Sequence, residues 1–199
     1  MLMIETIGNK LYGDRVREKV AHLMPFIPRA SRVLDFGSGD LTMLSQLKKR
    51  HPSLDASGVD VVDFGKRHSG IRFKQIRKDA IPYINSSFDI VISYFVFHHT
   101  TKPEDWFSEC IRVTRKRIIF VEPIWRHEAE LPFMCAWDTI CNRWKSHDVP
   151  LPFSFRSHTW WKQQITQHNL KLVALRDVEP MPAFFPIGRA KMFVADKIS

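Results

Sequence analysis

The sequence predicts an α/β protein with an open, mostly parallel sheet and helices on both of its faces. Short apolar runs that read as strands alternate with segments of helical spacing. The run Phe88–Phe95 is apolar almost throughout, as expected of a central parallel strand buried on both faces. An earlier run, Arg32–Phe36, opens directly into a glycine turn at the head of a predicted helix, an arrangement typical of such sheets.

Each element follows from a local pattern. The first helix has apolar residues at helical spacing and ends before two prolines, and the second places three leucines on one side. Proline near its start marks the third helix, because the missing N–H is harmless there. In chain order we expect a helix over Tyr12–Met24, a strand over Arg32–Phe36, a helix from about Asp40 to Arg50, strands at Ala56–Asp60, near Ile71–Ile76 and at Phe88–Phe95, a helix from Thr101 and Pro103, and a strand over Arg117–Val121.

The regular alternation stops at Pro123–Phe155, a segment rich in aromatic residues and prolines. Within it we expect a helix from Pro132 to about Lys145. Afterwards Ser157 is expected to cap a further helix. That helix should run to about His168, and two strands should follow at Leu170–Val178 and Arg189–Ile198.

Composition narrows the class of protein. A chain of 199 residues with 44% hydrophobic content is expected to form one domain with a substantial core. It has no membrane-length apolar run and no signal-peptide pattern, and three cysteines without metal-type spacing indicate reduced thiols in a cytoplasmic protein. The net charge of +9 favours acidic partners such as nucleic acid, but the basic residues are dispersed and form no RNA-binding arm.

The segment RVLDFGSGDL carries the strongest functional signal, an apolar run that ends in Asp35 and opens into Gly37 and Gly39. Asp35 and Asp40 flank these glycines, and two carboxylates would repel a pyrophosphate at the helix N-terminus. The G-x-G-x-x-G fingerprint of dinucleotide sites also fails, because its last position is Thr42. An acidic glycine loop suits a cofactor that has cationic groups and no phosphate, and S-adenosylmethionine (SAM) is such a molecule.

Acidic residues recur along the later strands. Asp60 closes the run ASGVD about twenty residues after the glycines, the separation at which an acid reaches ribose hydroxyls. Asp79 follows the third run, Asp89 begins the fourth, and the run RKRIIFVEP is expected to be the fifth strand. In this order and spacing the chain resembles class I SAM-dependent methyltransferases, and is most similar to their small UbiE-like or type 11 group.

The resemblance covers about Tyr12–Glu122, with a weaker match beyond it. It implies a Rossmann-like, seven-stranded, mostly parallel sheet with a reversed terminal hairpin and helices on both faces. It also implies a single domain over residues 1–199 with a lid-like insertion at about 123–156. Leu41 departs from the pattern, because the family often has a third glycine there, and a branched side chain could crowd the cofactor.

The resemblance assigns cofactor roles residue by residue. Asp35, Gly37 and Gly39 would hold the methionine end of SAM, while Asp60 would accept hydrogen bonds from the ribose hydroxyls. Val61 stands where the family packs an apolar side chain on adenine.

Other assignments compete with plainer interpretations. Asp79 and Ala80 match the motif that receives the adenine amino group. Tyr94 could stabilise the sulfonium through its aromatic face, or could equally be a core residue. Arg15, with Tyr12 beside it, could bind the cofactor's carboxylate, or could lie on the surface of the first helix.

His98 and His99 are candidate catalytic bases, because histidine accepts protons near neutral pH. Adjacent residues point apart in most conformations, which argues against a shared metal ion. The chain also lacks the clustered acids after the fourth strand that metal-dependent O-methyltransferases use. We therefore expect no metal.

The insertion contains candidate substrate-binding residues. Trp125, Trp137 and Trp144, with Phe153 and Phe155, could line an apolar pocket under a lid, or could pack as ordinary core or as a homodimer face. The preferred function is methyl transfer from SAM to a small, partly apolar acceptor. One alternative is an RNA or protein methyltransferase, although the chain lacks the Asn/Asp-Pro-Pro-Tyr/Phe motif of enzymes that methylate base or glutamine amino groups. The other alternative is a non-catalytic SAM-binding partner subunit.

Overall fold

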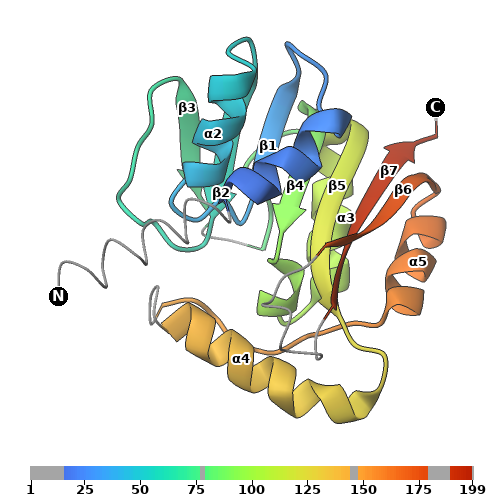
Figure 1. Ribbon diagram of the computed structural model, residues 1–199. Helices are drawn as coiled ribbons and strands as arrows, with labels where there is room; N and C mark the ends of the chain where they lie inside the picture. Colours follow the sequence, from blue (N-terminus) through green and yellow to red (C-terminus); the bar gives the residue numbers. More distant parts are fainter. Residues whose placement is uncertain (1–15, 77–78, 144–147, 179–188, 199) are drawn as a thin grey trace, which may run out of the picture.

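A seven-stranded sheet forms the centre of the computed structural model, which describes residues 16–76, 79–143, 148–178 and 189–198 (Figure 1). The strand order is β3-β2-β1-β4-β5-β7-β6. Strands β1 to β5 are parallel, and β7 runs antiparallel to both β5 and β6. Their bounds are β1 Arg32–Phe36, β2 Asp55–Asp60, β3 Ile71–Gln75, β4 Phe88–Tyr94, β5 Thr114–Ile124, β6 Leu170–Val178 and β7 Arg189–Lys197. The predicted fold class, including the reversed terminal hairpin, is confirmed.

Helices cover both faces of the sheet (Figure 1). One core layer packs residues 16–23, which are helical, and α2 against one face. The other layer packs α3 and α5 against the opposite face. The helices are α2 Thr42–Arg50, α3 Pro103–Val113, α4 Leu131–Arg143 and α5 His158–Gln167, with short 3-10 turns η1 Met24–Phe26, η2 Phe97–His99 and η3 Glu128–Glu130.

Two of the elements differ from their predicted bounds for identifiable reasons. Strand β5 continues to Ile124 rather than ending at Val121, because β7 pairs with it over its whole second half, up to Ile124 opposite Arg189. Helix α2 begins at Thr42, because Leu41 before it has a left-handed φ of 63°. The other predicted strands are each within one or two residues of their observed bounds.

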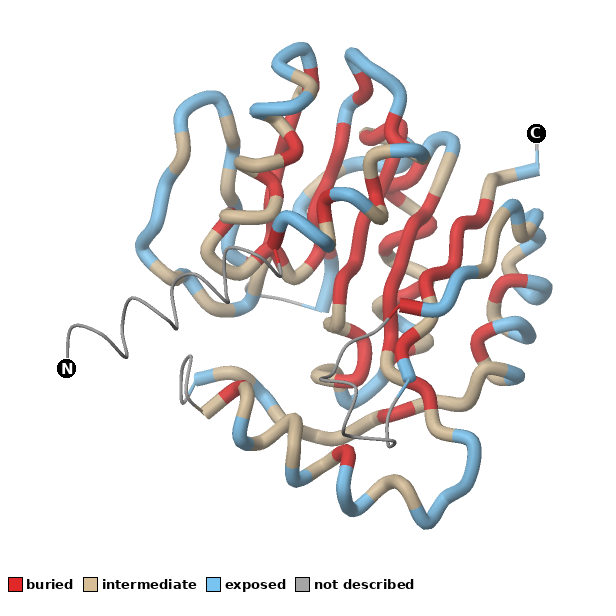
Figure 2. The backbone as a smooth tube through the Cα atoms, in the orientation of Figure 1, coloured by how far each residue is buried: buried red, intermediate tan, exposed pale blue. Residues whose placement is uncertain are grey.

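The carboxyl ends of the parallel strands meet at one edge of the sheet, and α4 lies across that edge (Figure 1). Figure 2 shows β4 buried along its whole length, whereas α4 is mostly half-buried or exposed. Ligands of open α/β sheets bind at this carboxyl edge. Within the described ranges, no helix combines the length and the apolar character that crossing a membrane requires.

Candidate active site at the carboxyl edge of the sheet

The glycine loop between β1 and α2 has the backbone that its sequence predicts. Gly37 and Gly39 both have positive φ angles, 75° and 53°. A Cβ at Gly37 would lie 2.3 Å from a Val96 methyl carbon, so only glycine fits there. A Cβ at Gly39 would meet no atom within 4 Å, so the chain leaves open space in front of it. Gly37 is therefore required for packing, and Gly39 faces the space into which a ligand can approach.

Leu41 does not crowd this space. It adopts the left-handed conformation, φ 63°, that explains why a glycine suits the position. Its side chain is 1% exposed and packs in the core with Leu44 and Leu47. A Cβ at Gly58 would lie 2.5 Å from Leu41 Cδ2, so the absence of a side chain on β2 makes the room that Leu41 fills. The departure from the family pattern is accommodated on the core side.

Asp35 is a buried acid without a protein partner. It is 1% exposed, and neither carboxylate oxygen accepts a hydrogen bond from any described residue. Burial and the nearby negative charge of Asp60 raise the pKa of Asp35 to about 8, although the positive charge of Lys19 opposes this rise. Buried polar atoms are normally satisfied, so this carboxylate indicates a site for a hydrogen-bond donor or a cation.

Asp60, at the end of β2, joins the glycine loop to the segment after β2. Its Oδ2 accepts from the Gly39 N–H at 2.8 Å, and its Oδ1 accepts from the Val62 N–H at 3.0 Å. Burial raises the pKa of Asp60, and these backbone donors oppose the rise. Each carboxylate oxygen has a second lone pair, so Asp60 retains acceptors for further donors such as vicinal hydroxyls.

Tyr94 ends β4 beside the same loop and is 8% exposed. The Lys19 Nζ lies 4.7 Å from the centroid of its ring. Tyr94 is thus a core residue whose ring face contacts the Lys19 ammonium, and its contact with a sulfonium stays a prediction. Burial, with the negative charge of Glu18, raises the pKa of Tyr94.

The remaining residues predicted to bind the cofactor are exposed or lie outside the described residues. Val61 is 44% exposed, which is unusual for a valine beside a buried strand end. Asp79 and Ala80 are exposed in the bend after β3. Arg15, like Tyr12, lies outside the described residues.

His98 belongs to a buried polar cluster that links η2, β5 and α4. Its Nδ1 lies 2.7 Å from Glu122 Oε2, and its Nε2 lies 3.5 Å from Asp138 Oδ1. Glu122 also accepts hydrogen bonds from the backbone N–H groups of Val96 and Phe97, at 2.9 and 2.8 Å. Burial alone would lower the pKa of His98, but Glu122 and Asp138 together raise it to about 9. A charged, buried histidine is poorly suited to act as a general base.

The expectation that adjacent histidines point apart is wrong. The rings of His98 and His99 have centroids 4.1 Å apart, and both histidines lie in the 3-10 turn η2. His99 Nδ1 lies 3.0 Å from the Pro150 carbonyl oxygen. Burial and the charge of His98 lower the pKa of His99 to about 4, so His99 is neutral at physiological pH.

Helix α4 exposes apolar side chains and buries polar ones. Phe133 and Ile140 are 58% and 59% exposed. Asp138 instead lies beside His98, with Oδ1 3.5 Å from the histidine Nε2, and accepts a hydrogen bond from the Asn142 side-chain amide at 2.7 Å. Trp137 is half-buried between the two sides.

The other residues predicted to bind the substrate differ in their burial and contacts. Trp125 is half-buried, and its indole Nε1 has no hydrogen-bond partner within the described part of the chain. Phe155 is buried and stacks on His98 at a centroid distance of 5.0 Å, while half-buried Phe153 lies beside it. Trp144 lies outside the described residues.

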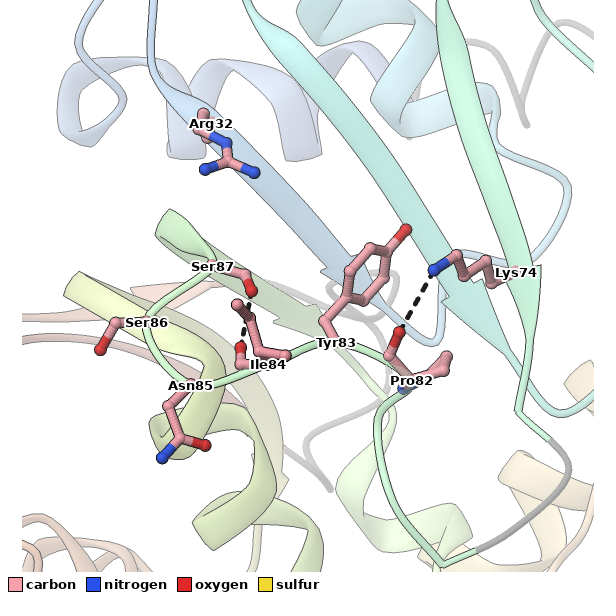
Figure 3. A pocket seen from close by; sticks show the side chains of 8 residues that line it. All are labelled: Arg32, Lys74, Pro82, Tyr83, Ile84, Asn85, Ser86 and Ser87. Carbon is pink, nitrogen blue, oxygen red and sulfur yellow. Dashed lines mark hydrogen bonds between the residues drawn. The ribbon is translucent and has the colours of Figure 1, made fainter.

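A shallow pocket of about 530 Å³ lies elsewhere, at the amino ends of β1 and β4 (Figure 3). Arg32 and Lys74 border it, together with residues 82–87. The Lys74 ammonium is already committed, because it donates to the Pro82 carbonyl at 3.3 Å and lies over the Tyr83 ring. This pocket opens at the edge opposite to the one where open α/β sheets bind ligands.

Sequence reasoning missed Glu122 and Asp138 as site residues. Glu122 carries a visible signal, since it closes an apolar strand as Asp35 and Asp60 do. Asp138 carries none, because a polar residue on an amphipathic helix is normally assigned to solvent. Its role depends on the orientation of α4, which a periodic pattern does not determine.

Part of the chain matches a known family model. Residues 34–121, from within β1 to within β5, match a family model described as a methyltransferase domain. Among curated protein sequences, none matches the chain significantly.

Solved structures share the fold at low sequence identity. A candidate methyltransferase from Bacillus halodurans C-125 is 15% identical, with a TM-score of 0.69 over 90% of this chain and 99% of that chain. Geranyl diphosphate C-methyltransferase from Streptomyces coelicolor A3(2), solved with Mg²⁺, a substrate analogue and S-adenosyl-L-homocysteine, is 13% identical, with a TM-score of 0.70 over 90% and 75%. The [4+2]-cyclase SpnF is 13% identical, with a TM-score of 0.68 over 92% and 80%.

The family model, the strand order with its reversed terminal hairpin, and the acidic glycine loop agree with one another. Residues 34–121 of this chain are thus similar to a methyltransferase domain, and the chain shares its fold with the solved methyltransferase structures named above.

Proposed function

We propose that this protein transfers the methyl group of SAM to a small, partly apolar acceptor bound between α4 and the carboxyl ends of β4 and β5. The observation that carries the proposal is the buried Asp35 carboxylate, which no described residue satisfies. It lies beside a glycine loop with open space in front of Gly39. A buried acid at such a loop fits a ligand that carries an ammonium and a sulfonium.

The described residues fit SAM along its length. Asp35 would bind the ammonium group, and Gly39 would allow close approach of the backbone. Asp60 already clamps the loop through Gly39 and retains lone pairs for the ribose hydroxyls. The exposed side chain of Val61 would pack on the adenine, with Asp79 and Ala80 near its amino group.

When bound, SAM supplies an activated methyl group. The protein must therefore align the acceptor with that group and exclude water, and a general base is not essential. Tyr94 ends β4 with a ring face that tolerates positive charge, as its contact with Lys19 shows. The His98 cluster beside it holds η2 and α4 in place through Glu122 and Asp138.

The proposed binding site for the methyl acceptor combines apolar surface with one hydrogen-bond donor. Trp137 and Phe155 offer aromatic surface near the cluster, and Trp125 offers an indole N–H that has no partner among the described residues. An acceptor with one polar atom on an apolar body would satisfy these groups. This favours a small organic molecule over a charged polymer.

The direct test is a turnover assay with the purified protein, SAM and a panel of small acceptors, which follows the appearance of S-adenosylhomocysteine. We expect SAM to bind and to be consumed only when an acceptor is present. SAM binding without turnover across a broad panel would favour a non-catalytic SAM-binding subunit, and no binding would overturn the proposal. This distinction matters because SpnF shows that the same fold also occurs in a cyclase.

A further inference from the structure

The cluster beneath α4 brings together chemistry that methyl transfer does not use. His98 and His99 lie in η2, and Asp138 lies in the middle of α4. One possible ligand atom from each of the three lies within 4.8 Å of the other two. We propose that His98, His99 and Asp138 form a binding site for a divalent transition metal ion such as zinc.

The hydrogen bonds of the two histidines leave the correct nitrogen available. His98 Nδ1 contacts the Glu122 carboxylate at 2.7 Å, and His99 Nδ1 contacts the Pro150 carbonyl at 3.0 Å. A carbonyl or an ionised carboxylate can only accept, so both rings carry a proton on Nδ1. The Nε2 atoms are therefore the potential ligands. Metal-bound histidines are held in this way, by an acceptor behind the ring.

The spacing around Asp138 suits a metal ion better than a hydrogen bond. Asp138 Oδ1 lies 3.5 Å from His98 Nε2, at the limit of hydrogen bonding. Asp138 Oδ2 is buried without a hydrogen-bond partner within the described residues, so this oxygen is available to a cation. Nitrogen and oxygen ligands at about 2.0–2.1 Å from a tetrahedral zinc ion are separated from each other by about 3.3 Å.

The charge of the cluster also favours a cation. Glu122 is 1% exposed, and the side chain of Asp138 is 14% exposed, so two carboxylates lie in a largely water-free region. Buried negative charges are costly unless positive charge accompanies them. Without a metal ion, a proton on His98 supplies part of that charge, and a divalent ion bound at His98 Nε2 would take the place of this proton. Since its ligands come from η2 and α4, the ion would also fasten α4 to the carboxyl edge of the sheet.

The test is a titration of the whole, metal-stripped protein with Co²⁺, whose visible absorption reports nitrogen and oxygen ligands, followed by competition with Zn²⁺. We expect one saturable site per chain. Asp138→Asn and His99→Ala should each weaken binding at least about tenfold. His51→Gln is the matched control, because His51 lies at the end of α2, away from the cluster, and it should bind Co²⁺ like the wild type.

Circular dichroism of each variant separates loss of a ligand from loss of the fold. Absence of saturable Co²⁺ binding, or equal affinity in Asp138→Asn and the wild type, would overturn the proposal. If Asp138→Asn lowers the melting temperature of the metal-free protein while Zn²⁺ stabilises neither form, the cluster is an ion bridge only and the proposal is wrong. The titration contains no SAM, so its result is independent of the proposed transferase activity.

Discussion

At the scale of single residues, Asp60 has a structural role and, in the proposed function, a binding role. It accepts backbone hydrogen bonds from Gly39 and Val62, and its remaining lone pairs would accept from the ribose hydroxyls. Hydrogen bonds to a charged group contribute about 1.5–3 kcal/mol each. We expect Asp60→Ala to raise the dissociation constant of SAM at least about tenfold in calorimetric titration. Asp60→Asn, which keeps one acceptor oxygen, should lose less. An unchanged constant for Asp60→Ala would remove Asp60 from the site.

Asp35 should make the stability of the free protein depend on pH. Its folded-state pKa of about 8 lies above the ordinary 3.8, so between these values the folded state holds a proton that the unfolded state has lost. The free energy of unfolding should therefore fall as pH rises through this range, by up to about 1.4 kcal/mol per pH unit. Asp35→Asn cannot ionise and should lack this decline.

Urea denaturation of wild type and Asp35→Asn at pH 5.5, 7 and 8.5 measures the effect, and the difference between them cancels the other titrating groups. We expect the variant to gain relative stability with rising pH and to lose SAM affinity. Parallel pH curves for the two proteins would contradict the burial of an unpaired Asp35 carboxylate.

At the scale of elements, the proposed function makes α4 the helix that contacts the acceptor. Trp137 is half-buried on the side between the His98 cluster and solvent, whereas Phe133 is 58% exposed. We expect Trp137→Ala to lower kcat/KM for an acceptor identified by screening at least about tenfold while SAM affinity changes little, because only the acceptor contacts this helix. Phe133→Ala is the matched control on the outer side and should have near-normal kinetics.

Other outcomes for α4 are equally informative. Joint loss of SAM binding and thermal stability in Trp137→Ala would make the residue part of the core. Normal activity in Phe133→Ala, combined with a smaller size in solution, would make the exposed side of α4 a homodimer face. Normal acceptor kinetics in Trp137→Ala would contradict its role in the acceptor site.

At the scale of the whole molecule, the charge of +9 raises the question of nucleic acid. Several arginines are already paired with acids: Arg67 with Asp63 at 2.7 Å, Arg112 with Glu109 at 2.7 Å, and Arg117 with Asp196 at 2.6 Å. We expect a single-stranded RNA oligonucleotide to bind more weakly than about 1 µM at physiological salt, measured by fluorescence anisotropy. Tighter binding accompanied by methyl transfer to the RNA would favour the RNA methyltransferase alternative.

The sequence by itself determined most of the strands, the helices and the glycine loop. Alternating apolar runs and amphipathic segments are local signals, so the positions of the elements followed from them, while the sheet order was implied by the family resemblance. Gly37 and Gly39 were predictable as turn residues, and both have positive φ angles. For Leu41, the sequence implied the left-handed backbone conformation, but it did not indicate that the side chain packs into the core.

Only the tertiary structure decided the acceptor side. Whether α4 turns Phe133 or Asp138 toward the sheet depends on contacts between elements far apart in the chain, which helical periodicity does not encode. The pairing of His98 with Glu122 spans β5 and η2, and the close approach of the His98 and His99 rings is likewise seen only in the folded chain. Local patterns specify elements, while burial and long-range charge pairing specify how those elements face one another.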